Sequence, residues 1–340
     1  MEKKKNMKTI YLVNRITKTS VPWRWSEYFN KNSKNNKINI VDIKLFVKNL
    51  KHYKREANIV HGHHIKAMSI FLLLNKRLKI KSIYTVHGSY LFLSKSNALL
   101  LKFIFKSSDK IIFVNRTLYS VLPQSYKNII KDKYEIILNG VEVDYKYKKV
   151  DIYQKFNIDI KDKIIFHPAR FVEEKNHIRI ISALKPLLDK DKKLKLILAG
   201  GGKLEDNIKL HIKKLNLSDS VILIGTIERD EVYNFLEKCE IFLMPSVSEG
   251  LNIAFLEAIS MKSKIVVSNI EQFTYPLEVY NLNPEQLNIT FVDPLDEENI
   301  YMGISKALSK NRNLECNYQD FSLNIMMKKY DNIYYILFFV

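Results

Sequence analysis

The 340-residue sequence predicts an α/β protein of two domains, each built around a parallel sheet. Short apolar runs alternate with helix-like segments along the chain, which is typical of parallel strands joined by crossover helices. The length suits two domains rather than one, and the 46% hydrophobic content is enough for a core in each. Several of the apolar runs end in histidine or glycine clusters. In such sheets, ligands bind beyond these strand ends.

The first domain is predicted over residues 1–145. Its strands are expected at 9–14, 38–43, 57–61, 83–86, 110–115 and 135–138. A helix is expected from residue 26, with Ser26 as its N-cap. Residues 89–110 combine bulky apolar side chains with lysines. This segment fits either a basic amphipathic helix on a membrane surface or a core helix, and both interpretations stay open.

Residues 146–156, rich in Lys and Tyr, are predicted to be a linker, and residues 157–320 to form the second domain. A closing helix is expected over 321–340. In the second domain, helices are expected at 204–215 and 231–238, and strands at 163–167, 194–199, 221–224, 241–244 and from 265.

The most informative stretch runs over residues 240–270. An apolar strand leads into a loop that ends in Glu249 and Gly250, and the following helix carries Glu257. The two carboxylates therefore flank a strand-to-helix turn, where open α/β sheets bind ligands. An ionised carboxylate only accepts hydrogen bonds, so this pair suits the hydroxyls of a sugar and a ribose.

These residues resemble the E-x7-E signature of the retaining glycosyltransferases with two facing Rossmann-like domains (GT-B type), in particular family 4. The segment PARFVEEKNH at 168–177 is similar to that family's GR-x4-K-N loop, with Ala169 in place of the glycine. The resemblance covers most of residues 57–270 and is strongest from 164 to 270. It implies that the closing helix packs back on the first domain, which would bind the acceptor.

The resemblance also implies a role for each matching residue. Arg170 and Lys175 would stabilise the negative charge that develops on the leaving diphosphate. Glu249 would bind a hydroxyl of the transferred sugar, and Glu257 would bind the ribose. The other implied donor-binding residues are Gly200, Gly202, Thr226, Ile227, Gly250, Leu251 and Asn252.

In the first domain, the strand-end motifs IVHGHH and TVHG look like those that line the inter-domain cleft of the family. By this resemblance, His87 would lie near the transferred sugar, although a hydrogen-bonded core histidine is an open alternative. His61, His63 and His64 also invite a zinc interpretation, but no acidic or cysteine ligand is near them in the sequence.

One loop departs from the family pattern. Residues 14–26 contain no glycine, whereas relatives often use glycines there to approach the donor phosphates. Arg15, Lys18 and Arg24 would supply charge instead, with Trp23 and Trp25 facing the sugar or the acceptor.

The implied activity is that of a retaining, metal-independent hexosyltransferase. It would move a sugar from a nucleotide-sugar, with a UDP type favoured, to a saccharide or lipid-linked acceptor in the synthesis of a cell-surface polysaccharide such as lipopolysaccharide or capsule. No cofactor is expected. The sequence Asp189-Lys190-Asp191 matches a metal-binding D-x-D motif, but it lies in an expected helix–strand turn, so no metal is assigned.

Charge is divided unevenly between the halves. Residues 1–150 carry 31 Lys and Arg against 9 Asp and Glu, whereas residues 151–340 carry 24 against 27. Such a basic half favours contact with an anionic membrane surface or with nucleic acid. The residues that the resemblance implies for donor binding lie in the less basic half, so no nucleic acid is expected. A basic nucleic-acid-binding protein and a nucleotide-sugar epimerase or phosphorylase of similar fold are the alternatives.

The expected location is cytoplasmic and peripheral, at the inner face of the cytoplasmic membrane. Cys239 and Cys316 form no disulfide framework or metal-binding spacing, which favours a reducing compartment. The N-terminal segment lacks the apolar core of a secretory signal, and the apolar runs are shorter than the roughly 20 residues of a membrane span.

Overall fold

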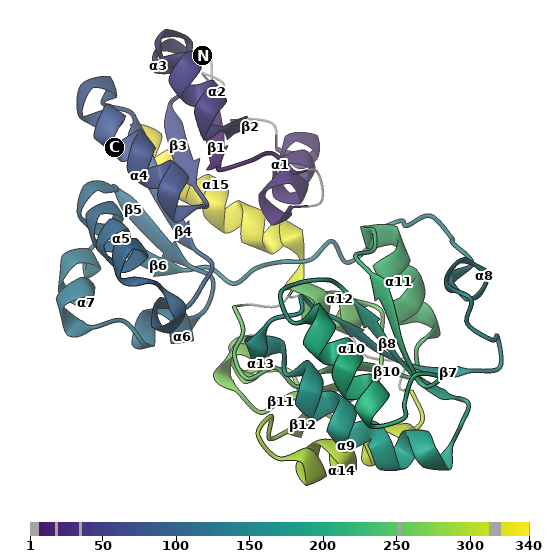
Figure 1. The fold of residues 1–340 in the computed structure, drawn as a ribbon. Coiled ribbons are helices and arrows are strands. Elements are labelled where there is room, and N and C mark those ends of the chain that lie inside the picture. Colours follow the sequence, from purple (N-terminus) through teal and green to yellow (C-terminus); the bar gives the residue numbers. More distant parts are fainter. Residues whose placement is uncertain (1–6, 18–19, 34–35, 251–252, 313–320, 340) are drawn as a thin grey trace. The chain divides into compact units, whose positions relative to one another are not determined.

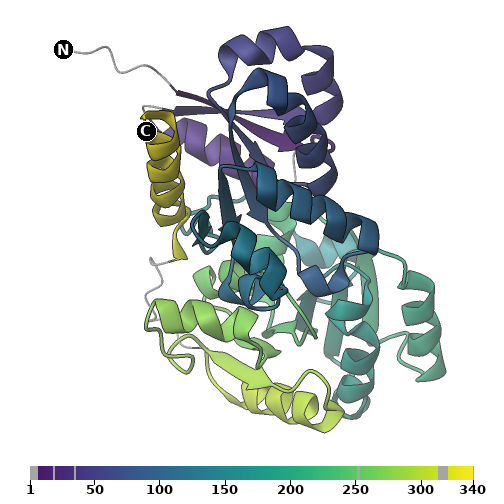
Figure 2. The ribbon, with the colours of Figure 1, turned by 90° about the vertical axis from the view of Figure 1, so that its left-hand side faces the viewer.

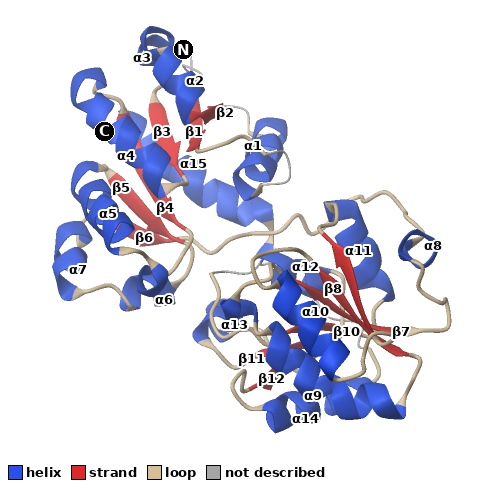
Figure 3. Cartoon of the chain, viewed as in Figure 1, coloured by secondary structure: helices blue, strands red, loops and turns tan. Residues whose placement is uncertain are grey.

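The computed structural model describes the chain except for residues 1–6, 18–19, 34–35, 251–252, 313–320 and 340. It divides into two compact units, one formed by Met1–Asn139 with Leu323–Val340 and the other by Gly140–Ser322. Each unit has a parallel sheet with helices on both faces (Figure 3). The predicted α/β class with two parallel sheets is confirmed. Leu251, Asn252, Lys18 and Cys316 lie outside the described residues.

The sheet of the first unit has six parallel strands in the order β2-β1-β3-β4-β5-β6. Its central strands are almost wholly buried, as their apolar sequences require. The strands are β1 (Met7–Val13), β2 (Asn36–Asp42), β3 (Ile59–Gly62), β4 (Lys81–Val86), β5 (Lys110–Phe113) and β6 (Tyr134–Ile136).

The connections of the first unit place its helices on opposite faces of the sheet. The connection from β1 to β2 runs toward one edge of the sheet, and the later connections run toward the opposite edge. Because crossovers between parallel strands are right-handed, α1 lies on one face of the sheet and α2 to α7 lie on the other. The elements are α1 (Val21–Asn32), α2 (Ile43–Lys48), α3 (Leu50–Glu56), α4 (Ile65–Leu78), η1 (Tyr90–Phe92), α5 (Lys95–Ser107), α6 (Arg116–Ser120) and α7 (Gln124–Ile130).

The last helix, α15 (Leu323–Phe339), packs on the first unit beside α1 (Figure 2). Tyr330 and Tyr334 are fully buried in the core that this helix shares with Trp25 and Phe29 of α1. The Tyr334 hydroxyl hydrogen-bonds the Tyr11 hydroxyl at 3.0 Å and Nδ1 of the His61 ring at 2.8 Å. Polar as well as apolar contacts therefore fix α15 to the first sheet.

The sheet of the second unit is also parallel, in the order β12-β11-β10-β7-β8-β9. The strand order reverses between β7 and β10, because β8 and β9 lie on one side of β7 and β10 to β12 on the other. The strands are β7 (Lys163–Pro168), β8 (Leu194–Ala199), β9 (Val221–Gly225), β10 (Ile241–Met244), β11 (Ile265–Ser268) and β12 (Ile289–Val292).

One hydrophobic core of the second unit lies between its sheet and α9, α10 and α14 (Figure 1). On the other face, Phe235 of α11 stacks on Phe166 of β7 with ring centroids 4.7 Å apart. The elements are α8 (Ile152–Phe156), η2 (Glu173–Lys175), α9 (His177–Lys190), α10 (Glu205–Lys214), α11 (Arg229–Lys238), α12 (Ile253–Ser260), α13 (Glu271–Val279) and α14 (Glu297–Ser309).

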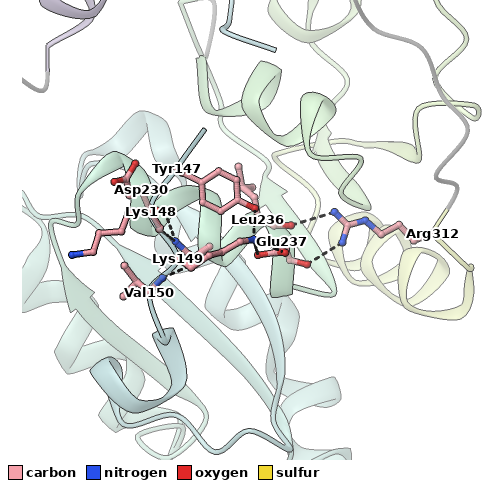
Figure 4. A network of polar contacts seen from close by, with 9 residues as sticks. Tyr147, Lys148, Lys149, Val150, Asp230, Leu236, Glu237 and Arg312 are labelled. Carbon is pink, nitrogen blue, oxygen red and sulfur yellow. Dashed lines mark hydrogen bonds and ion pairs between the residues drawn. The ribbon is translucent and has the colours of Figure 1, made fainter. Parts of the chain in front are cut away.

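The segment expected to be a linker, 146–156, belongs to the second unit and lies along α11 (Figure 4). Lys149 forms an ion pair with Glu237 at 2.7 Å. The Asn234 side chain donates to the Lys148 carbonyl at 2.8 Å and accepts from the Val150 N–H at 3.1 Å. The segment is thus held by side chains of α11 rather than extended between the units.

Helix α1 begins earlier than the sequence predicts. It starts at Val21, and Pro22 occupies its first turn, where a missing N–H has no consequence. Ser26 is therefore inside the helix and not its N-cap, and its hydroxyl donates to the Trp23 carbonyl at 2.8 Å. Trp25 is only 2% exposed and packs in the core, so the expectation that it faces the sugar or the acceptor is wrong.

Within the described part of the chain, none of the helices has both the length and the apolar content needed to span a bilayer. Residues 95–107 form α5, whose Leu101, Ile104 and Phe105 are buried in the first unit while Lys95 and Lys106 are exposed. The helix is therefore part of the core and also presents a basic outer face.

Candidate active site

The candidate site lies at the carboxyl edge of the second sheet, where its strand order reverses between β7 and β10. Where the strand order of a parallel sheet reverses, the loops after the two neighbouring strands run in opposite directions and leave a crevice between them. Open α/β sheets bind ligands in this crevice. The loop after β7 carries Arg170 and Lys175, and the loop after β10 carries Glu249 and Gly250. The fold thus brings together residues about 75 positions apart, because β7 and β10 are paired.

The two loops are joined by an ion pair between Lys175 Nζ and Glu249 Oε1. The Lys175 side chain is 13% exposed and that of Glu249 is 5% exposed. A charge this deeply buried needs a partner, and each residue supplies it for the other. Backbone contacts fix the geometry, since the Val247 N–H donates to the Glu174 carbonyl at 2.8 Å.

Asn176 fixes the end of the loop after β7. It adopts a left-handed conformation with φ of 63°, which asparagine tolerates better than most residues. Its side-chain amide donates to the carbonyl of Pro245 at 3.0 Å and to that of Pro294 at 2.6 Å. The loops after β7, β10 and β12 are therefore tied together beneath Lys175.

Arg170 differs from Lys175 in its surroundings. Its side chain is exposed, and its guanidinium makes no hydrogen bond or ion pair with the residues that the structure describes. Its backbone is fixed by its neighbours, because the Ala169 N–H donates to the Ala199 carbonyl at 2.9 Å and the Phe171 N–H to the Gly201 carbonyl at 3.0 Å. A free guanidinium on a fixed loop can bind an anion through two parallel hydrogen bonds.

Gly200 and Gly202 follow β8 and pack against this same loop. Both have positive φ, +154° and +155°. A Cβ atom at Gly200 would lie 2.1 Å from the Ala169 carbonyl oxygen, and one at Gly202 would lie 2.6 Å from that of Phe171. The glycines are therefore required for the close approach of two loops, and this packing determines where Arg170 lies.

Thr226 and Ile227 lie in the loop after β9, which continues the same edge. The Gly200 N–H donates to the Gly225 carbonyl at 2.7 Å, so this loop is tied to the glycine loop. Thr226 is exposed and Ile227 is half-buried. The loop thus has an exposed residue at the carboxyl edge of the sheet.

Glu257 is on α12, 4% exposed, and its Oε1 accepts a hydrogen bond from Arg229 Nε at 3.4 Å. Arg229 also forms an ion pair with Glu142 at 3.3 Å, and its guanidinium carbon lies 3.6 Å from the centre of the Tyr145 ring. Burial lowers the Arg229 pKa, but its interactions with Tyr233 and Glu257 together outweigh burial and raise the pKa above its ordinary value. The guanidinium thus links Glu257 to the segment around residue 142.

Arg229, Glu142 and Tyr145 were not singled out by the sequence. An arginine at the start of a helix is unremarkable in a sequence, and Glu142 is 87 positions away from it. Only the folding of the segment after residue 139 onto α11 brings them together. The one local signal is Tyr145, an aromatic that follows the NGV-x-x-D motif.

Two buried histidines underlie Lys175 and were also missed. His167 lies in β7, one residue before its end, with Nδ1 2.7 Å from the Leu243 carbonyl oxygen, and His177 begins α9. Their rings meet edge to face at 4.7 Å. Burial lowers the pKa of His167 to about 4 and that of His177 to about 2. Both are therefore neutral at pH 7, so neither histidine adds a positive charge beside Lys175.

His87 belongs to the first unit, at the end of β4. Its Nε2 shares a hydrogen bond of 3.0 Å with Nδ1 of His63. Burial, with a smaller effect of His64, lowers the pKa of His87 to about 4. His87 is only partly buried, so a neutral imidazole that can donate or accept a hydrogen bond is available at this strand end.

The histidine cluster does not have the geometry of a zinc site. His61 uses both ring nitrogens, with Tyr334 at 2.8 Å and with Thr85 at 2.7 Å, and His64 is exposed while His61 and His63 are buried. Across the described ranges, no three His, Cys, Asp or Glu side chains are placed to hold a metal ion. Asp189 and Asp191 of the D-x-D match form ion pairs with lysines.

The sequence matches two families over complementary parts of the chain. Residues 149–319 match glycosyl transferases group 1, and residues 22–145 match glycosyltransferase family 4. The chain is 27% identical to the O-antigen biosynthesis glycosyltransferase WclY of Escherichia coli over 312 residues, 85% of this chain and 82% of that protein.

Other relatives match a smaller part. An uncharacterized glycosyltransferase of Methanocaldococcus jannaschii, MJ1178, is 30% identical over 63% of this chain. The matched region spans only 56% of the length of that relative. A Campylobacter jejuni protein named N-acetylgalactosamine-N,N'-diacetylbacillosaminyl-diphospho-undecaprenol 4-alpha-N-acetylgalactosaminyltransferase is 30% identical over 57% of this chain and 51% of its own.

Solved structures share the fold. The Anabaena protein Alr3699/HepE, crystallised with UDP and glucose, has a TM-score of 0.78 at 13% identity, covering 96% of this chain and 99% of that one. Sucrose-phosphate synthase from Thermosynechococcus elongatus has a TM-score of 0.77 at 15% identity, covering 98% and 99%. With two parallel α/β units of this type and a group 1 match over half of its length, the chain belongs to the glycosyltransferase group 1 family, of GT-B fold.

Proposed function

We propose that the protein is a retaining, metal-independent hexosyltransferase that moves a sugar from a nucleotide-sugar to a saccharide or lipid-linked acceptor. One observation carries the proposal more than any other. At the point where the second sheet reverses its strand order, the buried Lys175–Glu249 pair joins the loop after β7, which also carries the exposed Arg170, to the loop after β10. Cations for a diphosphate and a carboxylate for a sugar hydroxyl thus occur on adjacent loops.

The donor would bind with its diphosphate on Arg170 and Lys175. Arg170 suits a bidentate contact with phosphate oxygens, and Lys175 would act as a point charge. When phosphate oxygens approach Lys175, Glu249 would share that cation and turn its second oxygen to a hydroxyl of the transferred sugar. The backbone of Gly250 would continue this contact.

Glu257 would accept hydrogen bonds from the ribose hydroxyls. Arg229 would act as a positioning residue, because its side chain holds Glu257 from behind while stacking on Tyr145. Thr226 and Ile227 would present backbone groups to the base. A uridine diphosphate donor is favoured, and the structurally similar Alr3699/HepE protein was crystallised with UDP and glucose.

As the bond between sugar and phosphate breaks, negative charge develops on the leaving diphosphate. Fixed Arg170 and Lys175 would stabilise that charge without reorganising, which lowers the barrier. Retention of configuration follows if the acceptor attacks on the face that the phosphate leaves, with a phosphate oxygen taking the acceptor proton. His87, neutral at pH 7, would donate or accept a hydrogen bond to the transferred sugar and would not act as a cation.

The acceptor would bind to the first unit and be presented at the inner face of the cytoplasmic membrane. The relatives named for O-antigen synthesis and for a diphospho-undecaprenol substrate support a lipid-linked saccharide and a role in cell-surface polysaccharide synthesis. The net charge of +22 over residues 1–150 supports contact with anionic lipid.

A transfer assay tests this function. The purified protein is incubated with EDTA, a panel of labelled nucleotide-sugars and a lipid extract that supplies undecaprenyl-diphosphate saccharides. We expect one donor to label the lipid fraction, with the anomeric configuration of the donor retained in the product. Donor turnover without a labelled acceptor would instead indicate an epimerase or phosphorylase. No turnover of any donor, with tight salt-sensitive binding to nucleic acid, would indicate a nucleic-acid-binding protein.

A further inference from the structure

Three helices on one face of the first sheet carry only positive charge. Helices α2, α4 and α5 have 6, 14 and 13 residues and contain no Asp or Glu. Each of the three helices lies in a connection that advances in the same direction across the sheet, and right-handed connections of this kind place their helices on the same face. Helix α4 packs beside α2 and α5. Their eight cations are Lys44, Lys48, Lys66, Lys76, Arg77, Lys95, Lys102 and Lys106.

On α4, exposed cations and exposed apolar side chains lie along the same side of the helix. Lys66, Ile70, Leu73 and Arg77 recur at intervals of four, three and four residues, which places them on one side of a helix. Ile70 is 42% exposed and Leu73 is 60% exposed. The opposite side of α4 is buried and packs in the core, so Ile70 and Leu73 are not part of the core.

Helix α5 repeats the pattern. Lys95, Leu99, Lys102 and Lys106 follow the same four, three, four spacing, and Leu99 is 69% exposed. The Lys102 ammonium lies 5.7 Å from the centre of the Tyr126 ring, which keeps that side chain near the surface of the unit. We call the eight residues of the two stripes the α4–α5 face: Lys66, Ile70, Leu73, Arg77, Lys95, Leu99, Lys102 and Lys106.

An exposed leucine alone is not unusual, as α10 of the second unit shows. Leu210 on that helix is also 69% exposed, with Lys209 and Lys213 close to it. There, however, Glu205 and Asp206 share the helix, and Glu205 forms an ion pair with Lys209 at 2.6 Å. What distinguishes the α4–α5 face is that its exposed aliphatic side chains lie among cations that have no acidic residue on their own helices.

We propose that the α4–α5 face docks on a bilayer that contains anionic lipid. Ile70, Leu73 and Leu99 would enter the boundary between headgroups and acyl chains, while the lysines and Arg77 bind lipid phosphates. A nucleic acid fits this face less well, because proteins bind its strands with cations and stacking aromatic rings and gain nothing from exposed aliphatic chains. The proposal specifies the surface for the membrane contact proposed above and rests on it, but it does not depend on sugar transfer.

Vesicle co-sedimentation tests the proposal with the full chain and no donor present. The vesicles are phosphatidylcholine with about two fifths phosphatidylglycerol, compared with phosphatidylcholine alone. We expect binding only to the anionic vesicles. Lys95→Gln/Lys106→Gln should weaken it about fivefold per lysine, and Leu73→Ser/Leu99→Ser should weaken it by roughly tenfold or more. Leu210→Ser, at equal exposure, is the matched control and should bind like the wild type.

Three results would overturn the proposal. These are no binding to anionic vesicles, equal binding by Leu73→Ser/Leu99→Ser and the wild type, or displacement of the protein from vesicles by duplex DNA with no effect of the leucine changes. The melting temperature measured without ligand should stay close to that of the wild type in every surface variant, which checks that each is folded. Vesicle binding is measured without turnover. An inactive wild type would therefore contradict the proposed function but not the proposal that the α4–α5 face binds membranes.

Discussion

The buried ion pair between Lys175 and Glu249 makes a sharp distinction between function and stability possible. Removing one partner leaves an uncompensated buried charge, which typically costs about 3–5 kcal/mol of unfolding free energy. Glu249→Ala or Lys175→Ala would therefore lose both activity and stability, and neither variant alone separates the two roles.

A double variant separates them. In Lys175→Met/Glu249→Met no buried charge remains, and replacing a buried pair by apolar side chains is often neutral or stabilising. We expect urea unfolding to show most of the stability lost by Lys175→Met restored, while sugar transfer stays absent. Glu205→Gln, which removes an exposed carboxylate paired with Lys209, is the control and should change neither property. Normal transfer by the double variant would contradict the roles proposed for this pair.

Arg229 gives a second prediction at this scale. If it positions Glu257 for the ribose, Arg229→Lys should weaken discrimination between a nucleoside diphosphate and its 2′,3′-dideoxy analogue, because lysine cannot reach Glu257, Glu142 and the Tyr145 ring together. Hydrogen bonds to a charged group are worth about 1.5–3 kcal/mol, so we expect the wild-type preference for the ribose to be roughly tenfold or more.

Calorimetric titration of both ligands measures that preference directly. Arg312→Lys is the control, because Arg312 donates to several carbonyls, including those of Met261 and Lys262, and its loss should lower stability without changing the preference. If Arg229→Lys kept the wild-type ratio of affinities, Arg229 would have only a structural role.

Residue by residue, candidate site residues could be singled out from the sequence only where their signal was local. Lys175 and Asn176 lie within one loop, and the spacing of Glu249 and Glu257 is visible in the chain itself. Arg229 with Glu142 could not be predicted, because their contact depends on how a segment without regular structure folds onto α11. Gly200 and Gly202 were expected to bind the donor, and their geometry adds a packing requirement that the spacing of residues in the sequence does not reveal.

At the scale of elements, α15 depends on two buried tyrosines. Tyr334→Phe would remove the hydroxyl that contacts Tyr11 and His61 and leave both groups without that partner inside the core. Unsatisfied buried groups of this kind cost about 1–3 kcal/mol, so the free energy of unfolding should fall by that amount.

Tyr335→Phe is the matched control for this prediction, since Tyr335 is the next residue and is 59% exposed. Its change should stay within about 0.5 kcal/mol. Equal urea midpoints for the two variants would show that the hydrogen bonds of Tyr334 do not stabilise the docking of α15.

The elements themselves were predicted well where apolar strands are long and buried, as in β7 and β8. The predicted start of α1 was wrong because Ser26, in a Trp-rich run, looked like an N-cap, whereas Pro22 lies in the first turn of the helix. For the same reason the inward direction of Trp25 was missed, since a shifted helix start changes which side chains face the sheet.

At the scale of the whole molecule, the buried histidines predict sensitivity to acid. The folded-state pKa values of His167 and His177 are about 4 and about 2, below the ordinary value of 6.5. Between pH 6.5 and about 4 the unfolded chain therefore binds more protons than the folded chain, and stability falls as the pH falls. Lowering the pH from 6.5 to 5 should cost about 2 kcal/mol per histidine.

Thermal unfolding from pH 7.5 down to pH 4.5 measures this dependence. His177→Phe keeps an aromatic ring beside Phe171 and removes one titrating group, so its stability should fall less steeply with pH than that of the wild type. Identical slopes for the two proteins would show that His177 does not contribute to acid unfolding.

The central claim is that the second unit binds a nucleotide-sugar through cations on the loop after β7 and needs no metal to do so. The most direct test is the shift in melting temperature on adding each nucleoside diphosphate in the presence of EDTA, for the wild type and for Arg170→Ala. Ligand at 100 times its Kd stabilises the folded state by about 2.7 kcal/mol. The account predicts a shift with one diphosphate, which names the base, and its loss in Arg170→Ala; no shift with any diphosphate would contradict it.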